Sequence, residues 1–169
     1  MALVKLTGIE GGDWSPLEEG EKPEEGASVA VPLARVIDED EGFFDIAGKV
    51  GAIVPTDTDY TALAPLANKL GYVEIEFPAF GDGRGFSLAV RLRKDLGFTG
   101  EIRATGPVIP DQALFLLRAG FDTVEVAAER RQAFEAALSR FKQFYQTDYT
   151  GQVSLAHLRH RPEAERKAS

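Results

Sequence analysis

The chain has 169 residues, of which 44% are hydrophobic and 27% charged, with no cysteine and a formal net charge of −8. The lack of cysteine excludes disulfides, thiol nucleophiles, cysteine-based zinc sites and iron–sulfur clusters held by thiolates. The two histidines are His157 and His160, so residues 1–156 offer no imidazole for a catalytic triad or a metal site.

The charge is unevenly distributed. Residues 1–60 hold 4 Lys or Arg and 14 Asp or Glu, whereas residues 61–169 are nearly balanced. An acidic chain without a basic stripe argues against nucleic acid as a partner. No apolar run approaches the roughly 20 residues of a membrane span, so we expect no membrane partner. The absence of cysteine and of a secretory signal pattern favours a cytoplasmic protein.

Residues 1–27 are predicted to form a peripheral N-terminal arm. A short strand is expected at residues 3–6, and the polar run at residues 18–26 indicates an exposed loop. Trp14 is a candidate anchor of this arm to the body of the protein.

Residues 28–150 are predicted to form a single α/β domain, followed by a polar tail at 151–169. Strands are expected at residues 28–31, 49–54, 72–77, 101–105 and 122–126, and helices at 32–41, 63–70, 83–96, 111–119 and 129–145. Five βα units indicate a mainly parallel five-stranded sheet with right-handed crossovers. Both a partial TIM-barrel-like sheet and an open doubly wound sheet fit this pattern, whereas a closed barrel needs eight units.

Helix boundaries can be predicted from single residues in this domain. Asp57 or Thr58 is expected to cap the second helix, and Asp111 the fourth. Gly97 and Gly120 are expected to end the third and fourth helices.

The loop FPAFGDGRG at residues 77–85 is the richest candidate site, because ligands in parallel α/β folds gather at the carboxyl ends of strands. Gly83 and Gly85 permit close backbone approach, and Arg84 adds a fork of donors that suits a phosphate, sulfate or carboxylate. The alternative is structural, with Asp82 capping the helix, the glycines forming a tight turn and Arg84 pairing with Asp82 or another carboxylate. The loop is a poor dinucleotide fingerprint, because Phe86 and Leu88 stand where a third glycine would be needed, so no cofactor is predicted.

Further polar residues are predicted to share one crevice with this loop. Asp82 and Asp111 are the candidate acid–base residues. The candidate anion-binding residues are Gly83, Arg84, Gly85, Arg103 and Gln112. A closed network of ion pairs fits the same residues.

Two other groups of residues favour a structural interpretation. Glu74 and Glu76 share one strand face with Tyr72, which would be the interior in a barrel but a solvated face in an edge strand. A position at an edge or an interface is favoured. His157 and His160 could form a pair at helical spacing, but two ligands make no closed metal site, so no metal is predicted.

The segment from Phe77 to Val126 resembles an uncharacterised bacterial family, domain of unknown function 934. The resemblance rests on an F-P-x-F-x-D-G-R block, a G-E-[IL]-R-A strand, a D-Q helix start and an R-x-G-F-D segment. It extends more weakly to Asp13-Trp14 and Tyr145-Gln146. The chain departs from the family pattern at Pro110, where an arginine is expected, and at Ala119, where a cysteine is usual.

The resemblance implies a place in sulfur metabolism, because genes of this family often stand beside those for assimilatory sulfite reduction. A sulfite reductase catalytic subunit needs sirohaem coupled to an iron–sulfur cluster, which a chain without cysteine cannot hold through thiolates. We therefore expect an accessory factor in sulfite or sulfate reduction, without its own redox centre. Sulfite-reduction proteins are candidate partners.

Two other functions remain open from the sequence. One is a small lyase or isomerase acting on an anionic metabolite, which requires a pocket that holds Asp82, Arg84 and Asp111 together. The other is an assembly or interaction module, which is favoured by a closed salt-bridge network beside an apolar face. A homodimer is expected, because the 11 Phe and 4 Tyr supply much apolar surface and an open sheet has two edges to protect.

Overall fold

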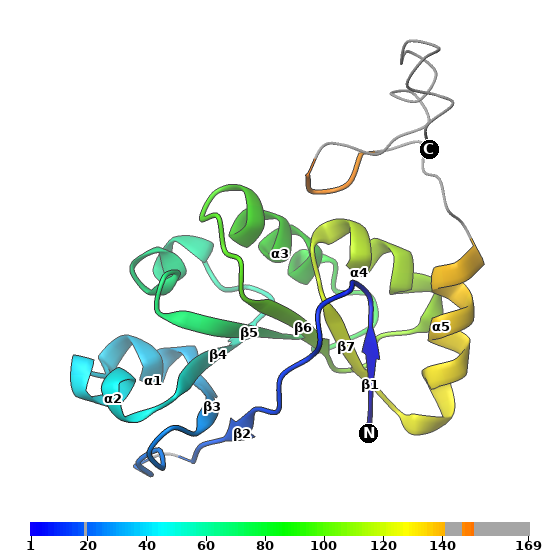
Figure 1. Ribbon diagram of the computed structural model, residues 1–169. Helices are drawn as coiled ribbons and strands as arrows, with labels where there is room; N and C mark the ends of the chain where they lie inside the picture. The colour runs from blue at the N-terminus through cyan, green and yellow to red at the C-terminus, as the bar shows by residue number, and fades with distance from the viewer. Residues whose placement is uncertain (19, 141–146, 151–169) are drawn as a thin grey trace, which may run out of the picture.

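The computed structural model describes residues 1–18, 20–140 and 147–150. Within these residues, seven strands form one curled sheet, a half-barrel with helices along its outer face (Figure 1). The strands are β1 (Ala2–Lys5), β2 (Ser15–Pro16), β3 (Ser28–Pro32), β4 (Lys49–Pro55), β5 (Leu70–Glu76), β6 (Glu101–Thr105) and β7 (Thr123–Val126). The helices are α1 (Leu33–Asp38), α2 (Glu41–Ile46), α3 (Arg84–Lys94), α4 (Ala113–Ala119) and α5 (Arg131–Arg140), with 3₁₀ turns η1 (Tyr60–Leu66), η2 (Pro110–Gln112) and η3 (Ala128–Arg130).

The strand order is β1-β7-β6-β5-β4-β3-β2, so β2 to β7 follow one another in the sheet as in the sequence. These strands pair in parallel, and β1 alone among the described strands runs antiparallel, against β7. Right-handed crossovers in an unreversed order place the helices on the same side of the sheet. The α/β class and the parallel pairing are therefore confirmed, whereas the doubly wound alternative is wrong because the order never reverses.

The predicted count of five strands is also wrong, because the N-terminal arm supplies both edges of the sheet. β1 pairs with β7 at one edge, and β2 pairs with β3 at the other. The chain between them crosses the concave face of the sheet (Figure 1). The two-residue β2 is too short to produce a hydrophobic period in the sequence.

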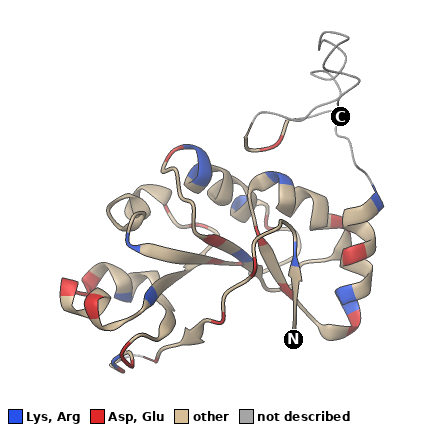
Figure 2. Ribbon diagram, viewed as in Figure 1, with Lys and Arg blue, Asp and Glu red and all other residues tan. Residues whose placement is uncertain are grey.

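The core lies between the convex face of the sheet and the helices. Alternate residues of the central strands are buried there, including Val73 and Ile75 of β5, Ile102 and Ala104 of β6, and Val124 of β7. Phe134 of α5 is fully buried in the same core. Acidic residues are concentrated on α1, α2 and the N-terminal segment (Figure 2), in agreement with the excess of Asp and Glu in residues 1–60.

Two predicted helices differ in the structure. The helix expected at 32–41 is shorter, because α1 ends at Asp38. A second helix that was not predicted, α2, begins at Glu41, where Asp40 accepts a hydrogen bond from the Phe43 amide (3.1 Å). The segment expected to be helical at 63–70 is a 3₁₀ turn that contains Pro65, which has no N–H to donate. Asp59 caps this turn rather than Asp57 or Thr58.

The concave face of the central strands carries polar side chains held against the arm. Glu101 accepts hydrogen bonds from the Gly12 amide (2.8 Å), the Trp14 indole (3.0 Å) and the Thr123 hydroxyl (2.6 Å). Its other contact is a salt bridge with Arg103 (2.8 Å), which also donates to the Gly12 carbonyl (2.7 Å). Trp14 is thus an anchor as expected, although its partners lie on the sheet.

Aromatic stacking reinforces this attachment. The rings of Trp14 and Tyr72 stack with centroids 4.6 Å apart, and the Arg103 guanidinium lies 5.0 Å from the centre of the Tyr72 ring. β5 is the middle strand of the seven described, so the predicted edge position of Glu74 and Glu76 is wrong. Glu74 instead accepts hydrogen bonds from Tyr72 (2.7 Å) and Thr105 (2.9 Å) on the concave face.

Glu101 makes the stability of the protein depend on pH. Burial alone would raise the pKa of Glu101, but the hydrogen bonds from hydroxyl, backbone, indole and guanidinium donors outweigh it and lower the pKa below the ordinary 4.5. A carboxylate with a lowered pKa in the folded state stabilises the fold above pH 4.5 and loses this effect as the pH falls further.

We expect Glu101→Gln to lower the free energy of unfolding by about 3 kcal/mol at neutral pH, because it leaves the buried Arg103 without its charged partner. Urea unfolding of both proteins at a series of pH values measures the difference. It should stay constant above about pH 5 and shrink below pH 4.5. A difference that grows on acidification would contradict the assignment.

Candidate functional site

The loop between β5 and α3 lies at the carboxyl end of the middle strand and is organised around Asp82. One carboxylate oxygen of Asp82 accepts a hydrogen bond from the Thr56 hydroxyl (2.7 Å) at the end of β4, and the other from the Arg84 amide (3.0 Å). The Arg84 guanidinium forms a two-pronged pair with the same carboxylate through Nε (3.0 Å) and Nη2 (2.7 Å). Asp82 therefore shapes the turn into α3 and pairs with Arg84. The predicted capping role is wrong, because the N-cap of α3 is Gly83 and receives no side-chain hydrogen bond.

The ion pair is partly open to solvent. The Arg84 side chain is 59% exposed and the Asp82 side chain 10%, and a second carboxylate, Asp57, lies 3.7 Å from Arg84 Nη1. The hydrogen bonds from Arg84 and then Thr56 hold the pKa of Asp82 well below its usual range. Asp82 is thus ionised at neutral pH, which suits it to hold Arg84 and not to donate a proton.

An incoming anion meets two carboxylates at this loop. The fork of Arg84 that would recognise a phosphate or sulfate is directed at Asp82. Binding through Nε and Nη2 requires the anion to displace Asp82, whose departure would leave the buried Thr56 hydroxyl without its acceptor.

The two glycines at the start of α3 have different roles. A Cβ at Gly85 would lie 2.6 Å from the Phe77 ring and 3.0 Å from the Thr56 methyl group, so this glycine allows α3 to pack closely on the sheet. A Cβ at Gly83 would meet nothing within 4 Å, and its φ of −87° suits any residue. Close packing, and not ligand approach, therefore explains Gly85.

The next loop along the sheet contacts this one through Gln112. Its side-chain oxygen accepts a hydrogen bond from the Ile109 amide (3.1 Å), and its nitrogen donates to the Phe80 carbonyl (3.3 Å). Gln112, and not the predicted Asp111, therefore provides the side-chain hydrogen-bond acceptor at the start of this helical segment. Asp111 is exposed at the first turn.

The structure does not bring Arg103 into this cluster. Arg103 lies on the concave face of β6, where it contacts Glu101, Thr123 and Gly12. Asp82, Gly83, Arg84 and Gly85 are contiguous, and Gln112 joins their loop through Phe80. The residues expected to share one crevice are thus divided between the carboxyl end of the sheet and its concave face.

A groove of about 720 Å³ runs between α3 and the η2–α4 segment. Phe86, Val90 and Ile109 line it, and Phe80 and Phe115 stand at its rim with 55% and 56% of their surface exposed. Asp111 and Gln112 line the groove, whereas Asp82 and Arg84 do not.

Sequence reasoning missed this groove. Ala113 and Leu116 are the fully buried residues of α4, whereas Phe115 between them is exposed. The sequence contained a signal for this groove, because Phe115 does not share the helix face of Ala113 and Leu116.

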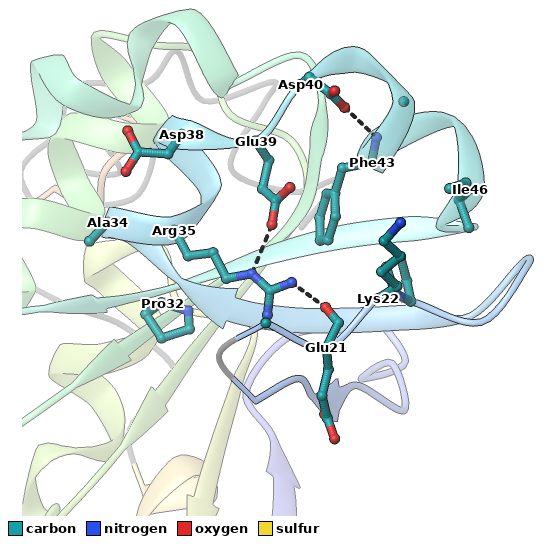
Figure 3. A pocket seen from close by; sticks show the side chains of 13 residues that line it. Glu21, Lys22, Pro32, Ala34, Arg35, Asp38, Glu39, Asp40, Phe43 and Ile46 are labelled. Atoms are coloured by element: carbon teal, nitrogen blue, oxygen red, sulfur yellow. Dashed lines mark hydrogen bonds and ion pairs between the residues drawn. The ribbon is translucent and has the colours of Figure 1, made fainter.

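A second hollow, of about 880 Å³, lies beside α1 and α2 (Figure 3). Arg35 stands at its centre and donates to Glu39 (2.8 Å) and to the carbonyls of Glu18 (2.5 Å) and Glu21. This guanidinium ties the N-terminal loop to α1. The N–H groups of Arg35 at this hollow therefore serve to connect parts of the fold.

The described residues contain no group of three or more His, Cys, Asp or Glu side chains placed to hold a metal ion. His157 and His160 lie outside the described residues. Within the described part of the chain, no helix is long and apolar enough to cross a membrane.

These features can be placed within a known protein family. A family described as bacterial protein of unknown function (DUF934) matches residues 51–156, well over half of the chain. The chain belongs to this family. The match contains the Asp82 loop and the groove, but neither the N-terminal arm nor the hollow around Arg35. No curated protein matches the chain.

We expect Gly85→Ala to destabilise the protein by roughly 1–3 kcal/mol, the usual effect of overpacking a core contact, and Gly83→Ala to leave stability nearly unchanged. Urea midpoints of the two variants and the wild type measure this. Equal effects of the two substitutions would show that Gly85 is not required for close packing of α3.

Proposed function

We propose that this protein is an accessory factor in assimilatory sulfite or sulfate reduction that acts by binding protein, without a redox centre of its own. The pathway is supported by the resemblance to a family whose genes often stand beside those for sulfite reduction. A role outside the redox reaction is supported by the absence of cysteine in the chain.

The observation that favours binding over catalysis is the contrast between the Asp82 loop and the groove. The candidate acid–base residue Asp82 is ionised, so it has no proton to donate, and its carboxylate is already bonded to Arg84 and Thr56. Beside it, the groove exposes two phenylalanines over an apolar floor. Exposed apolar patches of this kind are typical of protein interaction sites.

The competing function is a lyase or isomerase acting on an anionic metabolite. It requires Asp82, Arg84 and Asp111 around one pocket, and the groove holds only Asp111 of the three. The geometry therefore supports an interaction module better than an enzyme.

Genetic complementation tests the proposal. We expect deletion of the gene to slow growth on sulfate as the sulfur source but not on sulfide. Asp82→Asn and Arg84→Ala should restore growth, whereas Phe115→Glu, which places a charge on the groove rim, should not. The matched control is Ile37→Glu, which changes a similarly exposed residue (51%) on α1 and should restore growth.

Each part of the proposal has an outcome that contradicts it. Equal growth on sulfate with and without the gene would exclude a role in sulfite or sulfate reduction. Failure of Asp82→Asn or Arg84→Ala, with Phe115→Glu active, would favour the enzyme. Thermal unfolding with added sulfate adds a direct check, because stabilisation of the wild type that is lost in Arg84→Ala would indicate an anion site.

A further inference from the structure

The groove has opposite charges at its two ends. Asp111 is exposed at the start of the η2–α4 segment. Lys94 is exposed at the end of α3, and Arg118 lies near the end of α4. α3 and α4 follow parallel strands, so their starting ends lie together at one end of the groove and their final turns at the other.

Residues 147–149 also line the basic end of the groove. The Tyr149 amide donates to the Arg118 carbonyl (2.9 Å), and Arg118 donates to the Thr147 carbonyl (3.3 Å). Among the described residues that line this end, Lys94 and Arg118 outnumber the acidic Asp148 by one charge. The 11 residues of α3 separate the two ends by roughly 16 Å.

This arrangement of charges is complementary to itself. A twofold axis that lies across the groove brings the acidic end of one copy to the basic end of the other. An axis along the groove would instead place Lys94 against Lys94 and Asp111 against Asp111. Charge complementarity therefore selects the antiparallel arrangement.

We propose that a second copy of this chain occupies the groove, in an antiparallel twofold dimer with Lys94 of each copy facing Asp111 of the other. The inference rests on the proposed function, since it names the protein that the groove binds. The two exposed phenylalanines supply the apolar contacts. Phe80 and Phe115 of each copy pack against the apolar floor of the groove in the other copy.

Sedimentation of the full-length chain across the micromolar range tests the dimer. The wild type should sediment as a dimer, and Phe115→Glu as a monomer, whereas the control Ile37→Glu should remain dimeric. Each single charge reversal, Lys94→Glu or Asp111→Lys, should raise the dissociation constant by about tenfold or more, because it places like charges together twice in the dimer.

An equimolar mixture of the Lys94→Glu and Asp111→Lys chains tests the arrangement. In a mixed dimer the two substituted side chains would face each other with their charges exchanged, and the unchanged Lys94 and Asp111 would form the second contact. Dimerisation should therefore return to near the wild-type level. A mixture that dissociates as readily as its components would overturn the antiparallel arrangement. Circular dichroism of each variant separates loss of the dimer from loss of the fold.

The outcomes distinguish this inference from the proposed function. A monomeric wild type would overturn self-association. If Phe115→Glu then still failed to support growth on sulfate, the groove would bind a different protein and the proposed function would stand. A dimer disrupted by Phe115→Glu, together with normal growth of that variant, would support the inference and contradict the role of the groove in the proposed function.

Discussion

A singly wound half-barrel leaves the concave face of its sheet without helices, and the Glu101 carboxylate determines what covers that face. Glu101 holds the Gly12 amide, the Trp14 indole and the Arg103 guanidinium at one point. The segment between β1 and β2 is thereby fixed across the central strands. Both edge strands belong to the arm that this carboxylate anchors, so their pairing depends on it.

The location of Arg103 in this network has a consequence for function. Of the two arginines expected to bind an anion, Arg103 pairs with Glu101 on the concave face and Arg84 with Asp82 at the carboxyl end of the sheet. Both guanidinium groups are therefore paired with carboxylates of the same chain. The largest exposed aromatic side chains among the described residues lie instead around the groove between α3 and α4, which favours recognition of protein over chemistry on a small anion.

Local patterns in the sequence predicted the parallel strands well. The strand at 101–105 was predicted with its observed bounds, and Gly120 is the C-cap of α4 with a φ of 102°. The predicted end of α3 at Gly97 is wrong, because this helix ends at Lys94 with Asp95 as its C-cap. The other failures involve long-range contacts. Nothing local in the charged Glu74 shows that β5 is the middle strand, and nothing near Glu101 shows that Gly12 and Trp14 contact it from almost 90 positions away. The Asp82–Arg84 pair was predictable because its partners are two residues apart, whereas the groove required knowledge of how α3 and α4 pack.

Native-state hydrogen exchange tests most directly whether the arm is an integral part of the fold. The amide of Gly12 and the indole N–H of Trp14, both bonded to Glu101, should exchange about as slowly as the buried amide of Ile102, which is bonded to Asp122. The exposed amide of Gly81 provides the reference for rapid exchange. Exchange of Gly12 and Trp14 as fast as Gly81, while Ile102 stays protected, would show that the arm opens independently and would contradict the account.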